Sequence, residues 1–209
     1  MVHISRFMQE ICVVSVCGMR SGLPPEPRTV CNKPKENDSM NLIMSDKPLD
    51  VGLLDDATRH VDLSALKIAR CVGCFGCWTK TPSRCVIRDD ATKVYPLIAR
   101  SERLLYVSRV KFGSYDSVMK TMLERAIPVQ QAFIRIFHGE THHVQRAVVP
   151  KRATILAYGT TDAGEQELFR ELVARNARNM NFASYEIRFV AESQLDEAVQ
   201  NVLEQWKRS

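Results

Sequence analysis

The chain of 209 residues lacks several features that would settle its class at once. No stretch approaches the ~18 consecutive apolar residues of a membrane helix, because Arg, Lys, Asp or Glu interrupts every run. The net charge is only +5, and no block of like charges and no internal repeat is present. We therefore expect a soluble protein whose partners include neither a membrane nor a nucleic acid.

A secretory signal is also missing, since the apolar run Ile11–Val16 is too short and no small-residue cleavage pattern follows it. The 45% hydrophobic and 25% charged residues are the balance of a globular chain long enough for a real core. The seven cysteines form an odd set. We expect a cytoplasmic protein in which these cysteines are metal ligands or redox thiols and not structural disulfides.

The first 39 residues differ from the rest, because they hold four of the nine prolines and end in the polar, turn-rich stretch Pro34–Ser39. We expect residues 1–39 to be an N-terminal extension, disordered or arising from an upstream start codon. The domain itself then covers residues 40–209, beginning with the apolar run Leu42-Ile43-Met44.

From Met40 onward, short apolar runs alternate with amphipathic stretches. The strand candidates after the first run are Leu104–Ser108, Ala153–Ala157 and Tyr185–Val190. Helical periods appear over Thr92–Arg100, Ser117–Ile127, Glu167–Met180 and Leu195–Trp206. This alternation predicts an α/β fold with a parallel sheet covered on both faces.

In open parallel sheets the ligand lies beyond the carboxyl ends of the strands. That rule selects the segments Ser45–Lys47, Ser108–Ser114 and Tyr158–Thr161. The middle segment combines a hydroxyl, two cations, an aromatic ring and a glycine, which suits a planar, anionic cofactor. An ordinary surface connection with scattered charges is the alternative.

Four cysteines, Cys71, Cys74, Cys77 and Cys85, are spaced Cys-x2-Cys-x2-Cys-x7-Cys. Thiolates hold the irons of a cubane cluster, and close spacing lets one loop supply several corners. Zinc also takes four thiolates, although its sites are usually two separated Cys-x2-Cys pairs. Inert or redox-active thiols without a metal are the third interpretation.

The run Asp62–Asp90, which contains Cys71-Val72-Gly73-Cys74-Phe75-Gly76-Cys77 and Cys85-Val86-Ile87-Arg88-Asp89-Asp90, resembles the signature of flavodoxin-like NAD(P)H-dependent FMN reductases and of the related iron–sulfur flavoproteins. Val107–Gly113, then Lys120 and Glu124-Arg125, match the family's next strand, loop and helix. The resemblance covers roughly residues 41–125 well and the remainder in outline.

The resemblance implies a flavodoxin-like three-layer sandwich with a five-stranded parallel sheet in the order 2-1-3-4-5 and FMN beside strands 1 and 3. It implies a homodimer that uses NAD(P)H to reduce a small acceptor such as a flavin, a quinone or a nitro compound. The flavin ring does the chemistry, so we assign no catalytic residue. The residues expected to bind the cofactor are Ser45, Lys47, Ser108, Arg109, Val110, Lys111, Phe112, Gly113, Ser114, Tyr158, Gly159 and Thr160.

Two alternatives accompany this function. An iron–sulfur flavoprotein acting as an electron-transfer module would hold a [4Fe-4S] cluster on Cys71, Cys74, Cys77 and Cys85. A non-enzymatic flavodoxin-like domain would instead have lost its phosphate loop.

The sequence departs from the family after the first strand, where Met44-Ser45-Asp46-Lys47-Pro48 replaces a glycine- and serine-rich phosphate loop. Only about a dozen residues separate this segment from the second strand, so the first helix must be shortened. Asp46 would repel a phosphate. Either Lys47, Arg109 and Lys111 hold the phosphate as point charges, or the nucleotide pocket is lost.

The segment Pro128–Pro150 is longer than a usual connection and is expected to form a lid or a dimer arm. It contains His138, His142 and His143, for which we weigh a metal site against a solvated loop and favour the loop.

Overall fold

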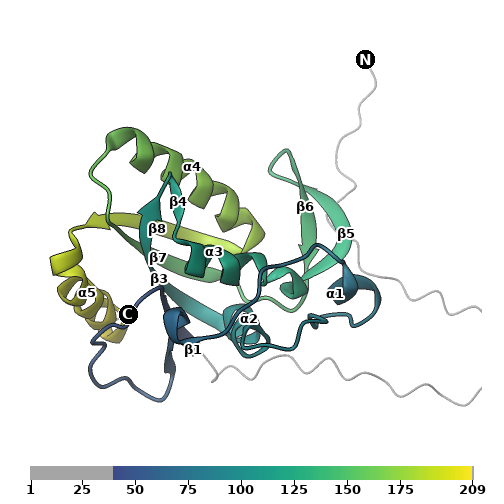
Figure 1. Ribbon diagram of the computed structural model, residues 1–209, viewed down its shortest axis with the longest axis horizontal. Coiled ribbons are helices and arrows are strands. Elements are labelled where there is room, and N and C mark those ends of the chain that lie inside the picture. The colour runs from purple at the N-terminus through teal and green to yellow at the C-terminus, as the bar shows by residue number, and fades with distance from the viewer. Residues whose placement is uncertain (1–39, 209) are drawn as a thin grey trace, which may run out of the picture. The chain divides into compact units, whose positions relative to one another are not determined.

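The computed structural model describes residues 40–208, so the expected extension 1–39 lies outside the described residues. Its strands are β1 (Met40–Ser45), β2 (Thr58–Asp62), β3 (Ser101–Lys111), β4 (Ser114–Tyr115), β5 (Gln130–Phe137), β6 (Glu140–Gln145), β7 (Lys151–Tyr158) and β8 (Phe182–Val190). Five of them form a parallel sheet in the order β2-β1-β3-β7-β8 (Figure 1). This confirms the flavodoxin-like order 2-1-3-4-5.

The helices are α1 (Gly76–Thr79), α2 (Ala91–Arg100), α3 (Ser117–Glu124), α4 (Ala163–Asn179) and α5 (Leu195–Arg208). Each helical period expected from the sequence lies on one of the last four. Asp116 and Asp162 cap α3 and α4, because each carboxylate accepts a backbone N–H of the first turn. Within residues 40–208, no helix is long and apolar enough to cross a membrane.

The central strands are buried on both faces, as a parallel sheet between helices requires. Alternate residues point to opposite sides, so Leu42 and Leu104 contribute to the core beneath α2, α3 and α4. Ile43 and Leu105 face the second core, which α5 covers. The sheet therefore lies between two helical layers and presents its carboxyl ends along one edge.

The connection between β1 and β2, residues 46–57, contains no helix, so the expected shortened first helix is wrong. The length explains the difference, because twelve residues must cross back along the sheet. Leu49, Val51 and Leu54 pack against the α5 side of the sheet instead. An irregular segment thus replaces a helix at the place where the family's phosphate loop would begin.

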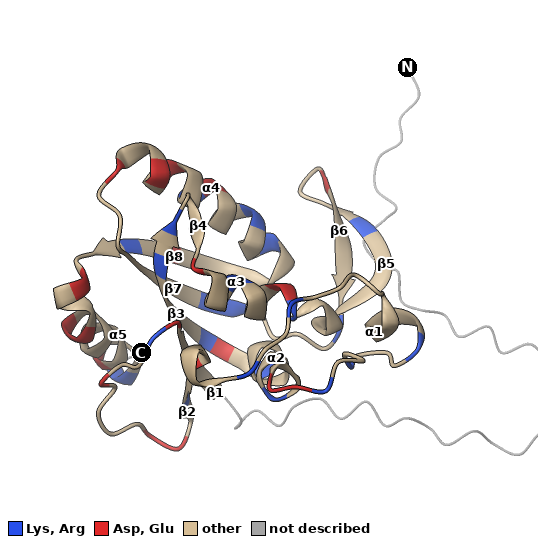
Figure 2. Cartoon of the chain, viewed as in Figure 1, with Lys and Arg blue, Asp and Glu red and all other residues tan. Residues whose placement is uncertain are grey.

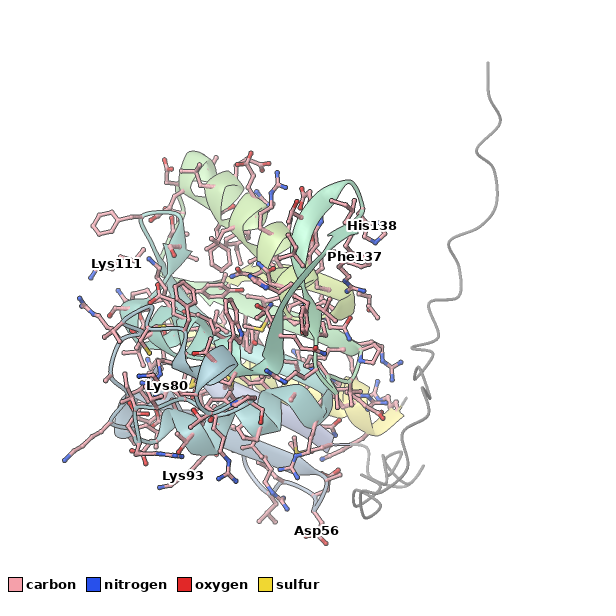
Figure 3. All side chains as sticks on the ribbon, turned by 90° about the vertical axis from the view of Figure 1, so that its right-hand side faces the viewer. Asp56, Lys80, Lys93, Lys111, Phe137 and His138 are labelled. Carbon is pink, nitrogen blue, oxygen red and sulfur yellow. The ribbon has the colours of Figure 1, made fainter. Side chains whose placement is uncertain are left out.

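The three histidines do not lie in the solvated loop that we favoured, because β5 and β6 pair as an antiparallel hairpin outside the main sheet. The expected lid or dimer arm stays a prediction. Figure 1 shows this hairpin beside α4, and Figure 3 shows Phe137 and His138 near its tip. His138 has a φ of 51°, the left-handed geometry of a tight turn. Phe133 and Ile136 on β5 are exposed.

Candidate functional site

The three segments selected from the sequence meet at the carboxyl ends of β1, β3 and β7, around the carboxylate of Asp46. The Arg109 backbone N–H donates to Asp46 Oδ2 at 2.7 Å, and the Ser108 hydroxyl donates to the same atom at 3.1 Å. The Tyr158 hydroxyl donates to Oδ1 at 2.8 Å. One buried carboxylate, directly after β1, therefore connects the carboxyl ends of β3 and β7.

Burial raises the pKa of Asp46, while the hydrogen bonds from Arg109 and Tyr158 act in the opposite direction. Burial, followed by the neighbouring Asp46 carboxylate, raises the pKa of Tyr158. The phenol is therefore held as a donor to the carboxylate. This pair orders the edge and is not arranged as a proton-transfer site.

Two cations lie at the same edge. Lys47 Nζ is 2.8 Å from Glu192 Oε1, and Arg109 Nη2 is 2.7 Å from Glu192 Oε2. Both cations lie over the Tyr158 ring, at 5.8 Å and 5.4 Å from its centroid. The hydrogen bond from Lys47 lowers the pKa of Glu192. We call Lys47, Arg109, Tyr158 and Glu192 the charged cluster.

Most of the segment Ser108–Ser114 is strand and not loop. β3 continues through Ser108–Lys111 and turns back into β4, so that Val110 is buried and pairs with Tyr115. Phe112 at the turn is 89% exposed with a φ of 53°. Figure 3 shows Lys111 at the outer surface of this turn. The turn therefore presents one cation and one aromatic ring on its open side.

Gly113 and Gly159 sit where other residues would be strained. Gly113 has a φ of +66°, its N–H donates to Glu165 at 3.1 Å, and an added Cβ would lie 2.7 Å from the Cβ of Leu168. Gly159 has a φ of +85°, and an added Cβ would lie 2.9 Å from the Arg109 side chain. Both glycines allow close packing within the protein.

Three further expected residues have partners within the chain. The Ser45 hydroxyl lies 2.9 Å from Nε2 of His60 on β2. The Thr160 hydroxyl accepts the N–H of Asp162 at 3.3 Å, and Ser114 belongs to β4. The expected binding residues thus fall into a central group around Asp46 and a peripheral group on the β3–β4 turn.

The cysteines lie in an excursion between β2 and α2, residues 67–90, which we call the thiol loop. The N–H groups of Lys67 and Ala69 donate to Asp90 and Asp89 at 3.0 Å and 2.9 Å. The buried Arg125 guanidinium donates to both Asp89 oxygens, at 2.7 Å and 2.9 Å, and to the Ala69 carbonyl at 2.7 Å. Arg125, which matches the family signature, therefore has a structural role, because it holds the two ends of the thiol loop together.

The four thiols occur within this loop as free cysteines, with Cys77 buried, Cys74 exposed, and Cys71 and Cys85 half-buried. Burial, then the proximity of Cys85 and the other two thiols, raises the pKa of Cys77. The thiols therefore neighbour one another. Among residues 40–208, however, no group of three or more His, Cys, Asp or Glu side chains is arranged to hold a metal ion. The thiols as placed do not fit an iron–sulfur cluster.

The histidines of the hairpin have separate environments. His142 lies between Glu140, at 2.9 Å, and Asn179, at 3.0 Å. The His143 ring lies 4.5 Å from the Trp78 ring, and the Trp78 indole N–H donates to the carbonyl of Gln130 at 3.1 Å. These contacts attach the hairpin to α4 and to the thiol loop.

A flavin phosphate does not fit the position that the family uses after the first strand. No helix N-terminus follows β1, and the available amide and hydroxyl donors are bonded to the Asp46 carboxylate. A phosphate fits the neighbouring charged cluster better, because Lys47 and Arg109 share the half-exposed Glu192 as their only carboxylate partner within residues 40–208. A phosphate dianion is a stronger partner for these two cations than one carboxylate.

The sequence reasoning missed Glu192, the counter-ion of the charged cluster. It lies two residues after β8, so the same rule about carboxyl ends would have selected it. Its role was hidden because residues 192–194 form a turn of helix before α5 and carry no glycine or motif.

Comparison with known proteins supports the fold. No family model matches the chain. An NAD(P)H:quinone oxidoreductase from Methanothermobacter marburgensis is 10% identical and superposes with a TM-score of 0.50 over 78% of this chain and 99% of that protein. An FMN-dependent NADH-azoreductase from Bacillus anthracis, solved in complex with FMN, is 10% identical with a TM-score of 0.51 over 80% of this chain and 96% of that protein. These likenesses confirm the flavodoxin-like fold.

A curated iron–sulfur flavoprotein from Archaeoglobus fulgidus is 34% identical over 68 residues. The match covers 32% of this chain and 30% of that protein. It confirms the resemblance noted from the cysteine run, over about a third of either chain.

Proposed function

We propose that this protein is an FMN-dependent oxidoreductase that passes electrons from NAD(P)H to a small acceptor such as a flavin, a quinone or a nitro compound. The shared fold with the quinone oxidoreductase and the azoreductase supports this class. The observation that carries the proposal is the charged cluster, in which one cation after β1 and one on β3 converge on one aromatic ring beside a single, displaceable carboxylate.

Lys47 and Arg109 would hold the phosphate in place of Glu192. The isoalloxazine would lie along the β3–β4 turn, where the exposed Phe112 ring offers a stacking surface and Lys111 a positive charge. When bound, FMN supplies a two-electron acceptor and donor. The chain's own contribution is to position the ring and to provide positive charge beside it, so no side chain is assigned as a general acid or base.

The decisive experiment is an FMN titration of the full chain, followed by quenching of flavin fluorescence. Glu192→Gln removes the competing carboxylate, so FMN should bind about threefold more tightly or better. Arg109→Gln should weaken binding about tenfold, because a charge-assisted contact to the phosphate is lost. Glu197→Gln, an exposed carboxylate on α5, removes the same charge outside the cluster and should leave the affinity unchanged.

Unquenched fluorescence with both the unmodified chain and Glu192→Gln would defeat this proposal. It would favour the non-enzymatic domain, for which the occupied donors around Asp46 are the supporting observation. Tighter FMN binding in Glu197→Gln to the same degree as in Glu192→Gln would show that net charge, and not the cluster, controls affinity.

An iron–sulfur electron-transfer module is the second candidate, supported by the match to the iron–sulfur flavoprotein and by the neighbouring thiols. The thiols must close further to bind a cluster, so we derive no step through one. Iron and sulfide assays on anaerobically purified protein test it. About four irons per chain, lost together in Cys74→Ala, support the module, and no iron refutes it.

We also propose a cytoplasmic homodimer without a nucleic-acid partner. The exposed apolar side chains Phe133, Ile134 and Ile136 on β5 support self-association through the hairpin. Sedimentation should give twice the chain mass, and Ile136→Lys should shift it toward the monomer. A monomer in both cases would contradict this assignment.

A further inference from the structure

A large cavity lies at the amino ends of β3 and β7, the opposite strand ends from the charged cluster. Its volume is about 890 Å³. Its lining includes Ala99 and Arg100, directly before β3, and Val148, three residues before β7. Ligand sites commonly measure roughly 300–1,000 Å³, so this cavity has the size of a binding site.

Four arginines line this cavity, and no acidic residue does. Arg84 and Arg88 belong to the thiol loop, Arg100 ends α2, and Arg146 follows β6. Figure 2 shows basic segments along the thiol loop and at α2. Four positive charges from three parts of the chain thus surround one space.

None of the four arginines forms an ion pair with a carboxylate within residues 40–208. The two acidic residues that follow Arg88 form ion pairs with other residues, Asp89 with Arg125 and Asp90 with Lys93. The Arg146 Nε donates to the carbonyls of Pro128 and Gln130 at 3.2 Å and 3.1 Å. Arg146 is therefore fixed in place, while the terminal nitrogens of its guanidinium carry no such bond.

The floor of the cavity is apolar. Tyr95, Pro128 and Val148 are buried and line it. The Tyr95 hydroxyl accepts the backbone N–H of Cys85 at 3.3 Å, which holds the phenol ring between α2 and the thiol loop. An apolar floor with a ring of guanidinium groups suits a flat body that carries several negative charges.

We propose that this cavity is a second binding site, and that its ligand is a phosphorylated nucleotide, a planar ring bearing two or more phosphate groups. The ring contacts the floor around Tyr95, and the phosphates engage Arg84, Arg88, Arg100 and Arg146. The site is distinct from the charged cluster, because β3 runs from Ser101 to Lys111 between them. Its ligand contacts the thiol loop directly.

Calorimetric titration of the full chain in metal-free buffer tests this site, with ATP, tripolyphosphate and adenosine as probes. ATP should bind at micromolar concentration, tripolyphosphate more weakly, and adenosine not measurably. The double variant Arg84→Gln/Arg100→Gln should weaken ATP binding about tenfold or more, because two charge-assisted contacts are lost.

The chain offers a matched control in Lys80→Gln/Lys93→Gln. Lys80 belongs to the thiol loop and Lys93 to α2, the elements of Arg84 and Arg100 (Figure 3). Neither lysine lines the cavity, and the two substitutions remove the same total charge as the arginine variant. ATP affinity should stay within about twofold of the unmodified chain, since distant surface charges are screened. Glu192→Gln should also leave ATP binding unchanged, which separates this site from the proposed flavin site.

Three results would overturn the proposal. One is an equal loss of ATP affinity in the two double variants, which would indicate diffuse surface charge. Another is an equal affinity for ATP and tripolyphosphate, or for ATP and adenosine, because the site would then not recognise both the ring and the phosphates. The third is no ATP binding to the unmodified chain at millimolar concentration.

Discussion

The two ends of the parallel sheet treat charge in opposite ways. At the carboxyl ends, the charged groups around Tyr158 have partners, with Asp46 bonded to three donors and Glu192 shared by Lys47 and Arg109. At the amino ends, the cavity arginines have no carboxylate partner within residues 40–208. The charged cluster at the carboxyl ends therefore has its counter-ion within the protein. The arginines at the amino ends have no counter-ion within residues 40–208, so they favour a bound anion.

Lys151 extends this contrast. It begins β7 and is fully buried, and its ammonium group donates only to the carbonyls of Val149 and Ala99, at 2.7 Å and 3.4 Å. Burial lowers its pKa to about 7. A lysine without a carboxylate thus lies beside a cavity of arginines, and the amino ends of the sheet gain stability whenever positive charge there is removed or neutralised.

The largest loss of stability is expected when the Asp46 carboxylate, at the carboxyl ends of the strands, is removed. Asp46→Ala leaves the Arg109 N–H and the Tyr158 hydroxyl without their acceptor in a buried place, while the Ser108 hydroxyl keeps the Arg109 carbonyl as an acceptor at 3.1 Å. We expect the free energy of unfolding to fall by about 3 kcal/mol or more. Urea denaturation followed by tryptophan fluorescence measures the loss.

Asp50→Ala is the control for this change. The carboxylate of the exposed Asp50 accepts only the N–H of Gly52, at 3.1 Å, so its removal should cost less than about 1 kcal/mol. Equal losses in the two variants would contradict the central role given to Asp46.

The unpaired charge of Lys151, at the amino ends of the strands, should make the stability of the fold depend on pH. The pKa of Lys151 is about 7 in the folded chain and 10.5 in the unfolded chain, so the unfolded state binds more protons between these values. Stability should therefore rise as pH increases from 7 to 10, by up to about 1.4 kcal/mol per pH unit.

Lys151→Met removes the titrating group and should flatten that rise while stabilising the fold at pH 7. Urea midpoints at pH 7, 8.5 and 10 for both chains measure the difference. Lys93→Met, at an exposed lysine on α2, should keep the slope of the unmodified chain. If Lys151→Met kept the slope as well, another group would be responsible.

Sequence reasoning succeeded where periodicity reports burial. The apolar runs 104–108 and 153–157 lie in the buried centres of β3 and β7, and the four helical periods lie on α2 to α5. It failed where strands are exposed. β3 continues beyond the apolar run through residues 108–111, whose alternation between buried and exposed positions the sequence reasoning overlooked. The side chains of β5 are mostly exposed and do not alternate, which hides the hairpin.

The sequence predicted where the candidate site lies, but not which of its polar groups are hydrogen-bonded to one another. The rule for the carboxyl ends of strands brought together Asp46, Ser108, Arg109 and Tyr158, although Asp46 entered only as a group that repels phosphate. Its acceptance of three donors depends on distances across the sheet that spacing along the chain does not encode. The cavity arginines were missed for the same reason, since they are scattered over residues 84–146.

The smallest expected effect concerns the repulsion among those arginines. At low salt, Arg84→Gln/Arg100→Gln relieves like-charge repulsion and should stabilise the free protein by about 0.5 kcal/mol. Lys80→Gln/Lys93→Gln removes the ion pair of Lys93 with Asp90 and should destabilise it slightly. The opposite signs are the test, because both variants lose the same charge. Urea midpoints at 20 mM and 500 mM NaCl should show the difference shrinking with salt, as a Debye length of about 20 Å falls to about 4 Å. Destabilisation by both variants at low salt would mean that the arginines are balanced within the chain, and the contrast between the two ends of the sheet would fail.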